Sequence, residues 1–238
     1  MKPYSTEEVA AYNATRSTWP EVMACFLRYI DSPNFLDAGC GTGNDLAEIF
    51  QKTGFGGYGC DYSKDMIAQA RKKVPTAIIR QANLDKKFPF DRQFDTIYMH
   101  DVIHHLKYPE VFIQDEANHL SRGGTLIIGS EFHEGLKEKF TSAYFPNAYA
   151  LDMARYDPKE KIVSALKKSG FEIADEIKIK GTEPFTPLIL EQTRTRSHSI
   201  LRLIPHDDFV VGLENLEQDV AAGKLTRIKR FYTLLVAK

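Results

Sequence analysis

The chain has 238 residues, of which 43% are hydrophobic, and its 31 lysines and arginines nearly balance its 32 acids, so the formal net charge is -1. This length can bury a full core as one domain with insertions, and the balanced charge gives no overall argument for nucleic acid or an anionic membrane as a partner. Three cysteines without disulfide or zinc spacing, no signal-peptide pattern and no apolar run long enough to span a bilayer lead us to expect a cytoplasmic protein.

The first 30 residues predict two helices and a polar connection. The S-x-x-E spacing that begins at Ser5 is typical of a capping box, and Pro20 suits the first position of a second, amphipathic helix. The connection has a large aromatic residue at each end and an arginine between them, which together offer apolar ring faces and a fork for a carboxylate. We therefore expect residues 1–30 to form a helical lid over a pocket, with packing of the two aromatics in the core as an equal alternative. The lid residues are Tyr12, Arg16 and Trp19.

Residues 34–45 predict a buried strand, a glycine-rich turn and the start of a helix. Gly39, Gly41 and Gly43 permit positive φ and leave no Cβ between the backbone and a ligand. The third glycine comes one position too early for the dinucleotide fingerprint G-x-G-x-x-G. Asp37, just before the turn, would repel a pyrophosphate and attract a cation. The turn therefore indicates a cationic ligand rather than a dinucleotide.

A second acid follows the next predicted strand. Tyr58–Cys60 forms a short strand that leads into Asp61, 18 residues after Gly43. In nucleoside-binding doubly wound folds an acid near this distance accepts hydrogen bonds from both ribose hydroxyls. Capping of the following helix is the alternative role, but Ser63 can supply that cap. We therefore expect Asp61 to bind a ribose.

Polar residues also follow the third and fourth predicted strands. Asn83 comes after the third strand, where its amide oxygen can accept a hydrogen bond from a ligand or close a turn. His100 ends the fourth strand and is expected to face the ligand or the substrate. The stretch from His100 to His104 imitates the zinc motif H-E-x-x-H, but its strand-like surroundings and its shorter acid argue against a metal site. We expect no bound metal.

The D-A-G-C-G-T-G turn at residues 37–43 and the unit at residues 94–106, which starts with F-D and ends with H-H-L, resemble motifs of class I S-adenosylmethionine-dependent methyltransferases. The resemblance implies an α/β fold with a doubly wound, mostly parallel, Rossmann-like sheet of seven strands, the last antiparallel, and helices on both faces. It implies S-adenosylmethionine as cofactor and S-adenosylhomocysteine as product, with Asn83 holding the adenine amine and Leu84 offering its backbone N–H. The cofactor-binding residues that we expect are Asp37, Gly39, Cys40, Gly41, Gly43, Asp61, Tyr62, Met66, Asn83, Leu84, His100 and Arg16.

Two insertions interrupt the single methyltransferase domain. We expect the cofactor-binding core at residues 31–130 and the last two strands at Phe171–Lys180 and Thr226–Ala237. The insertions at residues 131–157 and 182–223 are expected to build a lid and the substrate pocket, with a dimer contact or a solvated cap as alternatives. Four basic residues of the second insertion either bind an anionic substrate or are simply solvated: Arg194, Arg196, His198 and Arg202.

The implied reaction transfers a methyl group to an oxygen, nitrogen or carbon nucleophile of a small molecule. The sulfonium already supplies the leaving group, so a side-chain base is needed only when the nucleophile begins protonated. We expect that the adjacent residues His104 and His105 do not both face the pocket. The candidate bases, in order of preference, are His100, His104, His105, Tyr12 and His133.

Two other functions fit the sequence. The order of Tyr12, Thr15-Arg16 and Trp19-Pro20, with the later V-I-H-H, resembles tRNA wobble-uridine carboxyl methyltransferases, but the basic tail and the aromatic platform expected of RNA recognition are missing. A cofactor-binding protein without catalysis can have the same fold. We therefore expect a small-molecule acceptor and neither a nucleic-acid nor a membrane partner. The sequence does not name the acceptor, and a homodimer is compatible with it.

Overall fold

A seven-stranded sheet organises the part of the chain that the computed structural model describes, residues 5–15 and 18–238. The strands follow the order β3-β2-β1-β4-β5-β7-β6, and β7 runs antiparallel to both of its neighbours whereas β1 to β5 pair in parallel. This arrangement confirms the predicted doubly wound, mostly parallel sheet. The strands are β1 (Phe35–Ala38), β2 (Tyr58–Asp61), β3 (Ile78–Gln81), β4 (Phe94–His100), β5 (Leu120–Ser130), β6 (Ile173–Pro184) and β7 (Arg227–Ala237).

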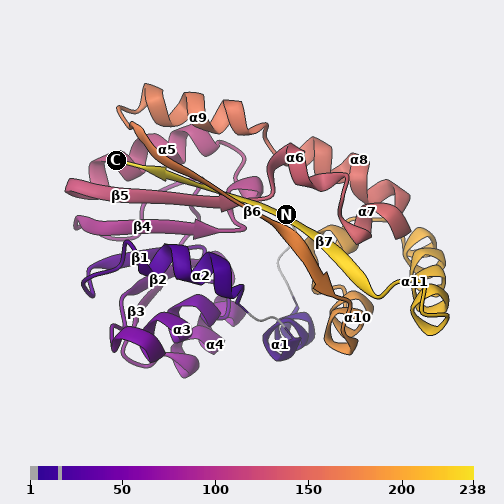
Figure 1. Ribbon diagram of the computed structural model, residues 1–238. Helices are drawn as coiled ribbons and strands as arrows, with labels where there is room; N and C mark the ends of the chain where they lie inside the picture. The colour runs from indigo at the N-terminus through magenta and orange to yellow at the C-terminus, as the bar shows by residue number, and fades with distance from the viewer. Residues whose placement is uncertain (1–4, 16–17) are drawn as a thin grey trace.

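Helices cover both faces of this sheet (Figure 1). On one face α5 (Pro109–His119) and α9 (Lys159–Lys168) bury their apolar residues against the strands. On the other face α2 (Pro20–Leu27), α3 (Asn44–Thr53) and α4 (Lys64–Lys73) bury their apolar residues against the strands. Because helices exclude water from both faces, the central strands are apolar on both sides, and all four residues of β1 are buried.

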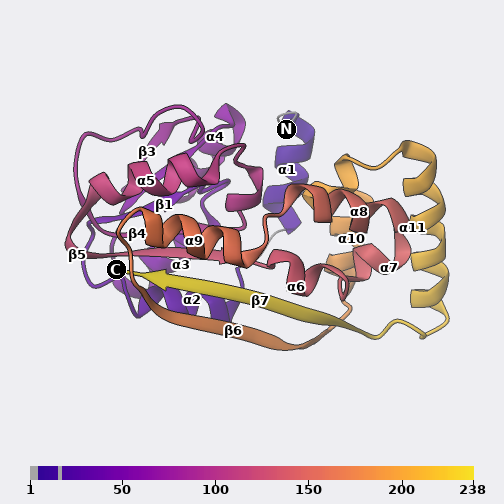
Figure 2. The ribbon, with the colours of Figure 1, turned by 90° about the horizontal axis from the view of Figure 1, so that it is seen from above.

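The strand order reverses between β1 and β4, which opens a crevice at the carboxyl ends of the parallel strands. The predicted insertions supply a group of helices beyond this edge, at one end of the molecule (Figures 1 and 2). Phe145, Ile200 and Phe209 bury one another there in a small core of their own. The helices are α6 (Phe132–Leu136), α7 (Phe140–Tyr144), α8 (Pro146–Arg155), α10 (Pro187–Arg194), η2 (Ser199–Arg202) and α11 (His206–Ala221).

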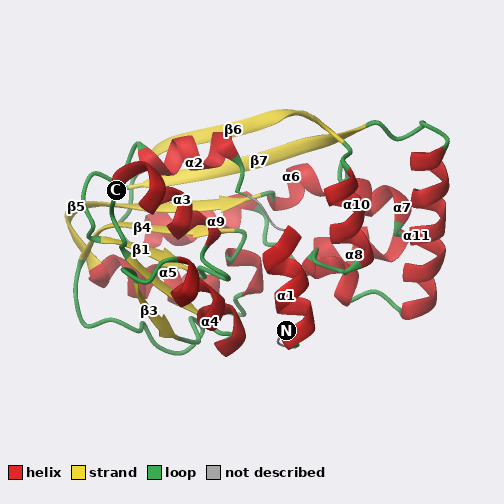
Figure 3. Ribbon diagram, turned by 90° about the horizontal axis from the view of Figure 1, so that it is seen from below, coloured by secondary structure: helices red, strands yellow, loops and turns green. Residues whose placement is uncertain are grey.

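Helix α1 (Thr6–Thr15) lies between α4 and α10, both of which it contacts (Figure 3). Its N-terminus has the predicted capping box, because the backbone N–H of Ser5 donates to Glu8 at 2.6 Å and the backbone N–H of Glu8 donates to the Ser5 hydroxyl at 3.2 Å. At its other end the Gln192 amide donates to the Thr15 carbonyl at 2.6 Å. Helix α1 therefore bridges the two halves of the molecule.

Two strands differ from the expected boundaries. The Gly123-Gly124 pair is typical of a turn, but both residues lie within the continuous strand β5, whose pairing with β4 jumps from Leu120 to Thr125. The glycines form a bulge inside the strand rather than a turn ahead of it. Strand β6 continues through Pro184, so the second insertion starts later than predicted. No helix in the described ranges has the length and apolar character needed to cross a membrane.

Candidate active site

The carboxyl ends of β1, β2, β3 and β4 line a cavity of about 360 Å³, which we call the first cavity. Every predicted cofactor residue in the described part of the chain lies on its wall except Gly43. Arg16 lies outside the described residues. The residues that follow four different strands therefore lie around one cavity, as expected for a ligand site at a topological switch point.

The three glycines of the turn have different roles. Gly39, Gly41 and Gly43 all have positive φ, at 98°, 51° and 76°. A Cβ at Gly39 would lie 2.3 Å from a methyl carbon of Val102, and one at Gly43 would lie 2.9 Å from the Cβ of Ala70, so these two glycines permit close packing. A Cβ at Gly41 would meet no atom within 4 Å. Gly41 alone presents open backbone to the cavity.

Asp61 is held by backbone N–H groups at the end of β2. Its carboxylate accepts hydrogen bonds from the N–H of Gly41 at 3.0 Å and from the N–H of Ser63 at 2.8 Å. Ser63 caps α4, since its hydroxyl accepts from the N–H of Met66 at 3.3 Å. Burial raises the pKa of Asp61 above its usual value, although the N–H donors oppose that shift. The carboxylate is oriented by the glycine turn and keeps lone pairs for a ligand.

An acidic pair lies beside the same turn. Asp37 is 2% exposed, and burial and then the nearby charge of Asp45 raise its pKa well above its usual range. Asp45, in the first turn of α3, contacts Nδ1 of His100 through a carboxylate oxygen at 2.7 Å. Two acids whose charges interact in this way favour a cation beside them.

The first cavity has two further polar features. The side-chain oxygen of Asn83 accepts the N–H of Asp85 at 3.0 Å, so it closes a turn while the residue lines the cavity. Thr42 is 1% exposed and lines the same cavity, and its buried hydroxyl has no hydrogen-bond partner among the described residues. A buried hydroxyl of this kind indicates a missing polar partner.

A second cavity of about 390 Å³ adjoins the first. Its wall comes from η1 (Ile103–His105), from the inserted helices and from the ends of β6 and β7. Tyr12, Asp101 and His105 line both cavities, so the two meet at these side chains. A ligand in one cavity can therefore approach a ligand in the other.

The candidate bases are divided between the cavities. His100 lines the first cavity, where it packs edge-on against Phe26, at 5.6 Å between ring centroids. His104 and His105 both line the second cavity, contrary to the expectation that only one would face the pocket. The short 3₁₀ turn that carries them lies along the wall, so successive side chains reach the same space. His133 bonds to the Tyr156 carbonyl at 2.6 Å and lines neither cavity.

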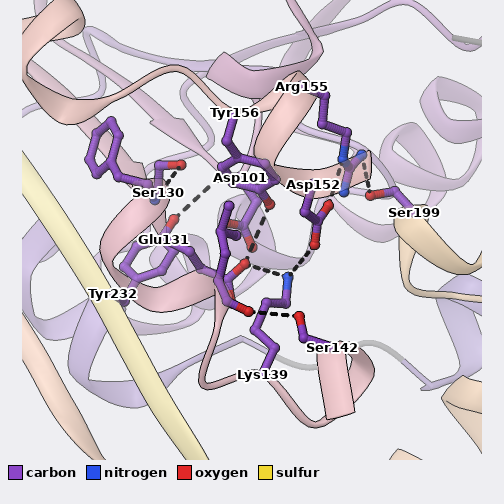
Figure 4. A network of polar contacts seen from close by, with 12 residues as sticks. Asp101, Ser130, Glu131, Lys139, Ser142, Asp152, Arg155, Tyr156, Ser199 and Tyr232 are labelled. Atoms are coloured by element: carbon purple, nitrogen blue, oxygen red, sulfur yellow. Dashed lines mark hydrogen bonds and ion pairs between the residues drawn. The ribbon is translucent and has the colours of Figure 1, made fainter. Parts of the chain in front are cut away.

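A buried polar network forms the inner wall of the second cavity, and Figure 4 shows Lys139 between two carboxylates. The Nζ atom of Lys139 is 2.5 Å from Glu131 and 3.5 Å from Asp152. Nε of Arg155 is 2.7 Å from the other oxygen of Asp152. The Tyr156 hydroxyl donates to Glu131 at 3.4 Å.

This network was not predicted from the sequence, although its position in the sheet gives one signal. Asp101 follows β4 and Glu131 follows β5, and these two strands are parallel neighbours. Polar residues after adjacent parallel strands meet at one edge of the sheet. The basic residues that were selected instead are mostly engaged elsewhere: Arg194 and Arg202 form ion pairs with glutamates, Arg196 lies over a phenylalanine ring, and of the four only His198 lines the second cavity.

Comparison with known proteins agrees with this geometry. Residues 36–128 match the family model of a methyltransferase domain. The matched part of the chain is therefore a methyltransferase domain, and the match supports the class I S-adenosylmethionine-dependent family that the sequence motifs resemble. A solved structure of an Anabaena variabilis protein, described as a methyltransferase from an antibiotic biosynthesis pathway, aligns with a TM-score of 0.74 at 20% identity and covers 94% of this chain and 99% of that one.

Two more similar proteins are informative. The dTDP-3-amino-3,4,6-trideoxy-alpha-D-glucopyranose N,N-dimethyltransferase of Streptomyces venezuelae is 30% identical over 131 residues, which are 53% of this chain and 50% of that protein. The match thus spans about half the length of that relative. Phosphoethanolamine N-methyltransferase 2 of Haemonchus contortus, solved with S-adenosylmethionine, has a TM-score of 0.61 at 19% identity and covers 98% of this chain and 57% of that one.

The first cavity fits the cofactor of this family, S-adenosylmethionine. The hydroxyl of Thr42 has no partner within the described residues and can form a hydrogen bond to a ligand. The backbone at Gly41 has free space beside it, so a ligand can approach it closely. The acids Asp37, Asp45 and Asp61 on the wall suit a ligand with two positive charges and a ribose. The donor set therefore agrees with the cofactor that the family model implies.

Proposed function

We propose that the protein transfers a methyl group from S-adenosylmethionine in the first cavity to a small molecule in the second. The observation that carries this proposal is the junction of the two cavities at Tyr12, Asp101 and His105. In-line transfer requires the acceptor atom, the methyl carbon and the sulfur to be aligned, and two ligands in adjoining cavities can reach this alignment at the junction. When bound, S-adenosylmethionine supplies an activated methyl group on a sulfonium.

In this proposal the residues at the ends of the first three strands bind different parts of the cofactor. Asp61 accepts hydrogen bonds from the ribose hydroxyls, because backbone donors already orient its carboxylate. Asn83 and Leu84 bind the adenine, which then lies near Tyr62 and Met66. Asp37 faces the cationic methionine end.

His100 acts here as a positioning residue rather than as a base. It lines only the first cavity and contacts Asp45 at 2.7 Å. The histidines near the acceptor are His104 and His105, and burial and then the charge of Arg155 lower the pKa of His105 to about 4. His105 is therefore neutral near pH 7 and can accept a hydrogen bond from the acceptor.

The acceptor is expected to enter the second cavity, whose wall includes both predicted insertions. In this proposal α1, which carries Tyr12, and the inserted helices keep water from the reacting atoms, because their residues line the cavity around the junction. The named activity of the Streptomyces venezuelae relative is N,N-dimethylation, so nitrogen is one of the acceptor atoms that the proposal covers, together with oxygen and carbon.

Calorimetric titration with S-adenosylmethionine and S-adenosylhomocysteine tests the cofactor assignment. The wild type should bind both, and Asp61→Asn should weaken binding by about tenfold to a hundredfold, because hydrogen bonds to a charged group contribute about 1.5–3 kcal/mol. Asp91→Asn is the matched control, since Asp91 is exposed and lines neither cavity. Absence of binding by the wild type, or equal binding by the two variants, would overturn the assignment.

A further inference from the structure

Glu131 presents one free carboxylate oxygen to the second cavity. Its other oxygen, Oε2, accepts hydrogen bonds from Nζ of Lys139 at 2.5 Å and from the Tyr156 hydroxyl at 3.4 Å (Figure 4). Oε1 accepts no hydrogen bond within the described residues. The side chain lines the second cavity and is 16% exposed. Because an ionised carboxylate can only accept hydrogen bonds, Oε1 suits a ligand that carries a donor.

A second polar group of the same wall also has no partner. Thr141 is 1% exposed and lines the second cavity, and its buried hydroxyl has no hydrogen-bond partner among the described residues. A hydroxyl can both donate and accept, and a buried one without a partner indicates that a polar group is missing beside it. Glu131 and Thr141 therefore both indicate a ligand whose polar group completes this wall.

The charges of the network around Glu131 already balance. Besides its contact with Glu131, Nζ of Lys139 lies 3.5 Å from Asp152, and Nε of Arg155 lies 2.7 Å from the same carboxylate. Two cations thus face two carboxylates. A ligand that completes this network needs to supply a hydrogen bond and not a further charge, since an uncompensated buried charge is costly.

The junction of the two cavities also disfavours a positive charge. His105 lines both cavities, and burial and then the charge of Arg155 lower its pKa to about 4, although the charge of Asp101 opposes the shift. A protonated amine at this place would meet the same burial and the same guanidinium. A neutral acceptor group is therefore favoured there.

The sheet places Glu131 at the edge where the cavities meet. In the parallel pairing of β4 and β5, His100 lies opposite Gly129, and the N–H of Asp101 donates to the Gly129 carbonyl at 3.2 Å. Glu131 follows Gly129 by two residues, so it ends at the same edge as Asp101, which lines both cavities. A group bound to Glu131 can therefore approach a ligand in the first cavity.

We infer that the methyl acceptor reacts through a neutral hydroxyl group, which donates a hydrogen bond to Oε1 of Glu131 and accepts one from Thr141. This inference rests on the proposed function. The hydroxyl oxygen forms a bond to the methyl carbon while the carbon–sulfur bond breaks and its electron pair stays on sulfur. The O–H proton passes to Oε1 of Glu131, which releases it to solvent when the product leaves. The products are a methyl ether and S-adenosylhomocysteine.

Three probes with one carbon skeleton test the inference: benzyl alcohol, benzyl methyl ether and benzylamine. Phe140, Leu188 and Ile189 give the cavity apolar surface that suits this skeleton. Each probe is titrated near neutral pH, with NMR detection, into protein saturated with S-adenosylhomocysteine. Benzyl alcohol should bind at least about tenfold more tightly than the ether, which has no donor for Glu131, as expected for a hydrogen bond to a charged group. Benzylamine should bind more weakly than the alcohol.

Two variants assign the preference to the wall residues. Glu131→Gln should lower the ratio of alcohol to ether affinity severalfold, whereas Glu214→Gln, at an exposed position of α11 that lines neither cavity, should retain it. Thr141→Val should weaken benzyl alcohol binding severalfold and yet raise Tm of the unliganded protein by about 2–4 °C, because it removes a buried hydroxyl without a partner. Thr226→Val, at an exposed position outside both cavities, should leave the affinity unchanged.

The outcomes separate this inference from the proposed function. If S-adenosylhomocysteine does not bind at all, the proposed function fails. If it binds but the alcohol shows no preference over the ether, the amine binds more tightly than the alcohol, or no probe binds detectably, the hydroxyl inference is wrong while the cofactor assignment stands. If Glu131→Gln does not fold, Thr141→Val decides, and unchanged alcohol binding by that variant would overturn the inference.

Discussion

Glu116 provides the sharpest test of how the sheet is packed. This carboxyl lies on α5 with no exposed surface, and neither of its oxygens has a hydrogen-bond partner among the described residues. Burial, and to a lesser extent the charge of Asp115, raises its pKa well above the usual value of 4.5. The folded protein therefore holds Glu116 as the neutral acid at a pH where the unfolded chain releases that proton.

Replacing this acid with methionine, Glu116→Met, should stabilise the protein. A buried polar group without a partner costs about 1–3 kcal/mol, and methionine has similar length and helix propensity without the polar oxygens. The free energy of unfolding should rise by about that amount, which for a chain of this size raises Tm by about 2–4 °C for each kcal/mol.

The gain should also depend on pH. Because the folded pKa lies above the unfolded pKa, the wild type loses stability as pH rises from about 4.5 through the folded pKa. The variant lacks this loss, so its advantage should be larger at pH 8 than at pH 4.5. Urea unfolding at both pH values measures the difference. Gln114→Met, at an exposed position of the same helix, should change stability by less than about 0.5 kcal/mol. A variant no more stable than wild type, or a gain independent of pH, would refute the reasoning.

Three further outcomes are expected. Gly41→Ala should fold, with the free energy of unfolding lowered by about 1–2 kcal/mol because of the positive φ, and should bind S-adenosylhomocysteine more weakly. Gly39→Ala should unfold at a much lower temperature, because its Cβ would overlap Val102. Thermal unfolding and calorimetry measure both effects, and similar behaviour of the two variants would contradict this reasoning. In ¹⁵N NMR the ring of His105 should stay neutral from pH 8 to pH 5, since its pKa is about 4, and protonation near pH 6.5 would contradict the burial argument. Arg202→Gln should loosen α1, because Nε of Arg202 is 3.1 Å from Glu8, and amide exchange in α1 should rise by about fivefold or more while exchange in β4 stays unchanged.

The cofactor side of the site was largely predictable from the sequence, for a physical reason. In a parallel sheet the residues that follow each strand meet at one edge, so short motifs at known spacing specify where Asp37, Asp61 and Asn83 converge. Ser63 was also identified as a helix cap from local sequence, and the cap is present. The same local logic predicted the capping box at Ser5. These features depend on neighbours in sequence or on strand order, and both can be read from a linear pattern.

Other parts of the site depend on contacts between distant residues. His100 and Asp45 are separated by 55 positions, so no motif reveals that this histidine is held at the first cavity rather than the second. The pairing of His104 and His105 on one wall depends on a 3₁₀ turn that the periodicity did not indicate.

The amino-acid sequence by itself determined the sheet, the glycine turn and the convergence of the acids at the strand ends, because local spacing and strand order specify them. Only the tertiary structure decided how the inserted helices pack and which of their charges are buried together. That packing places Lys139 between Glu131 and Asp152 on the wall of the second cavity. These ion pairs depend on how the helices fold against one another, which no local spacing in the sequence specifies.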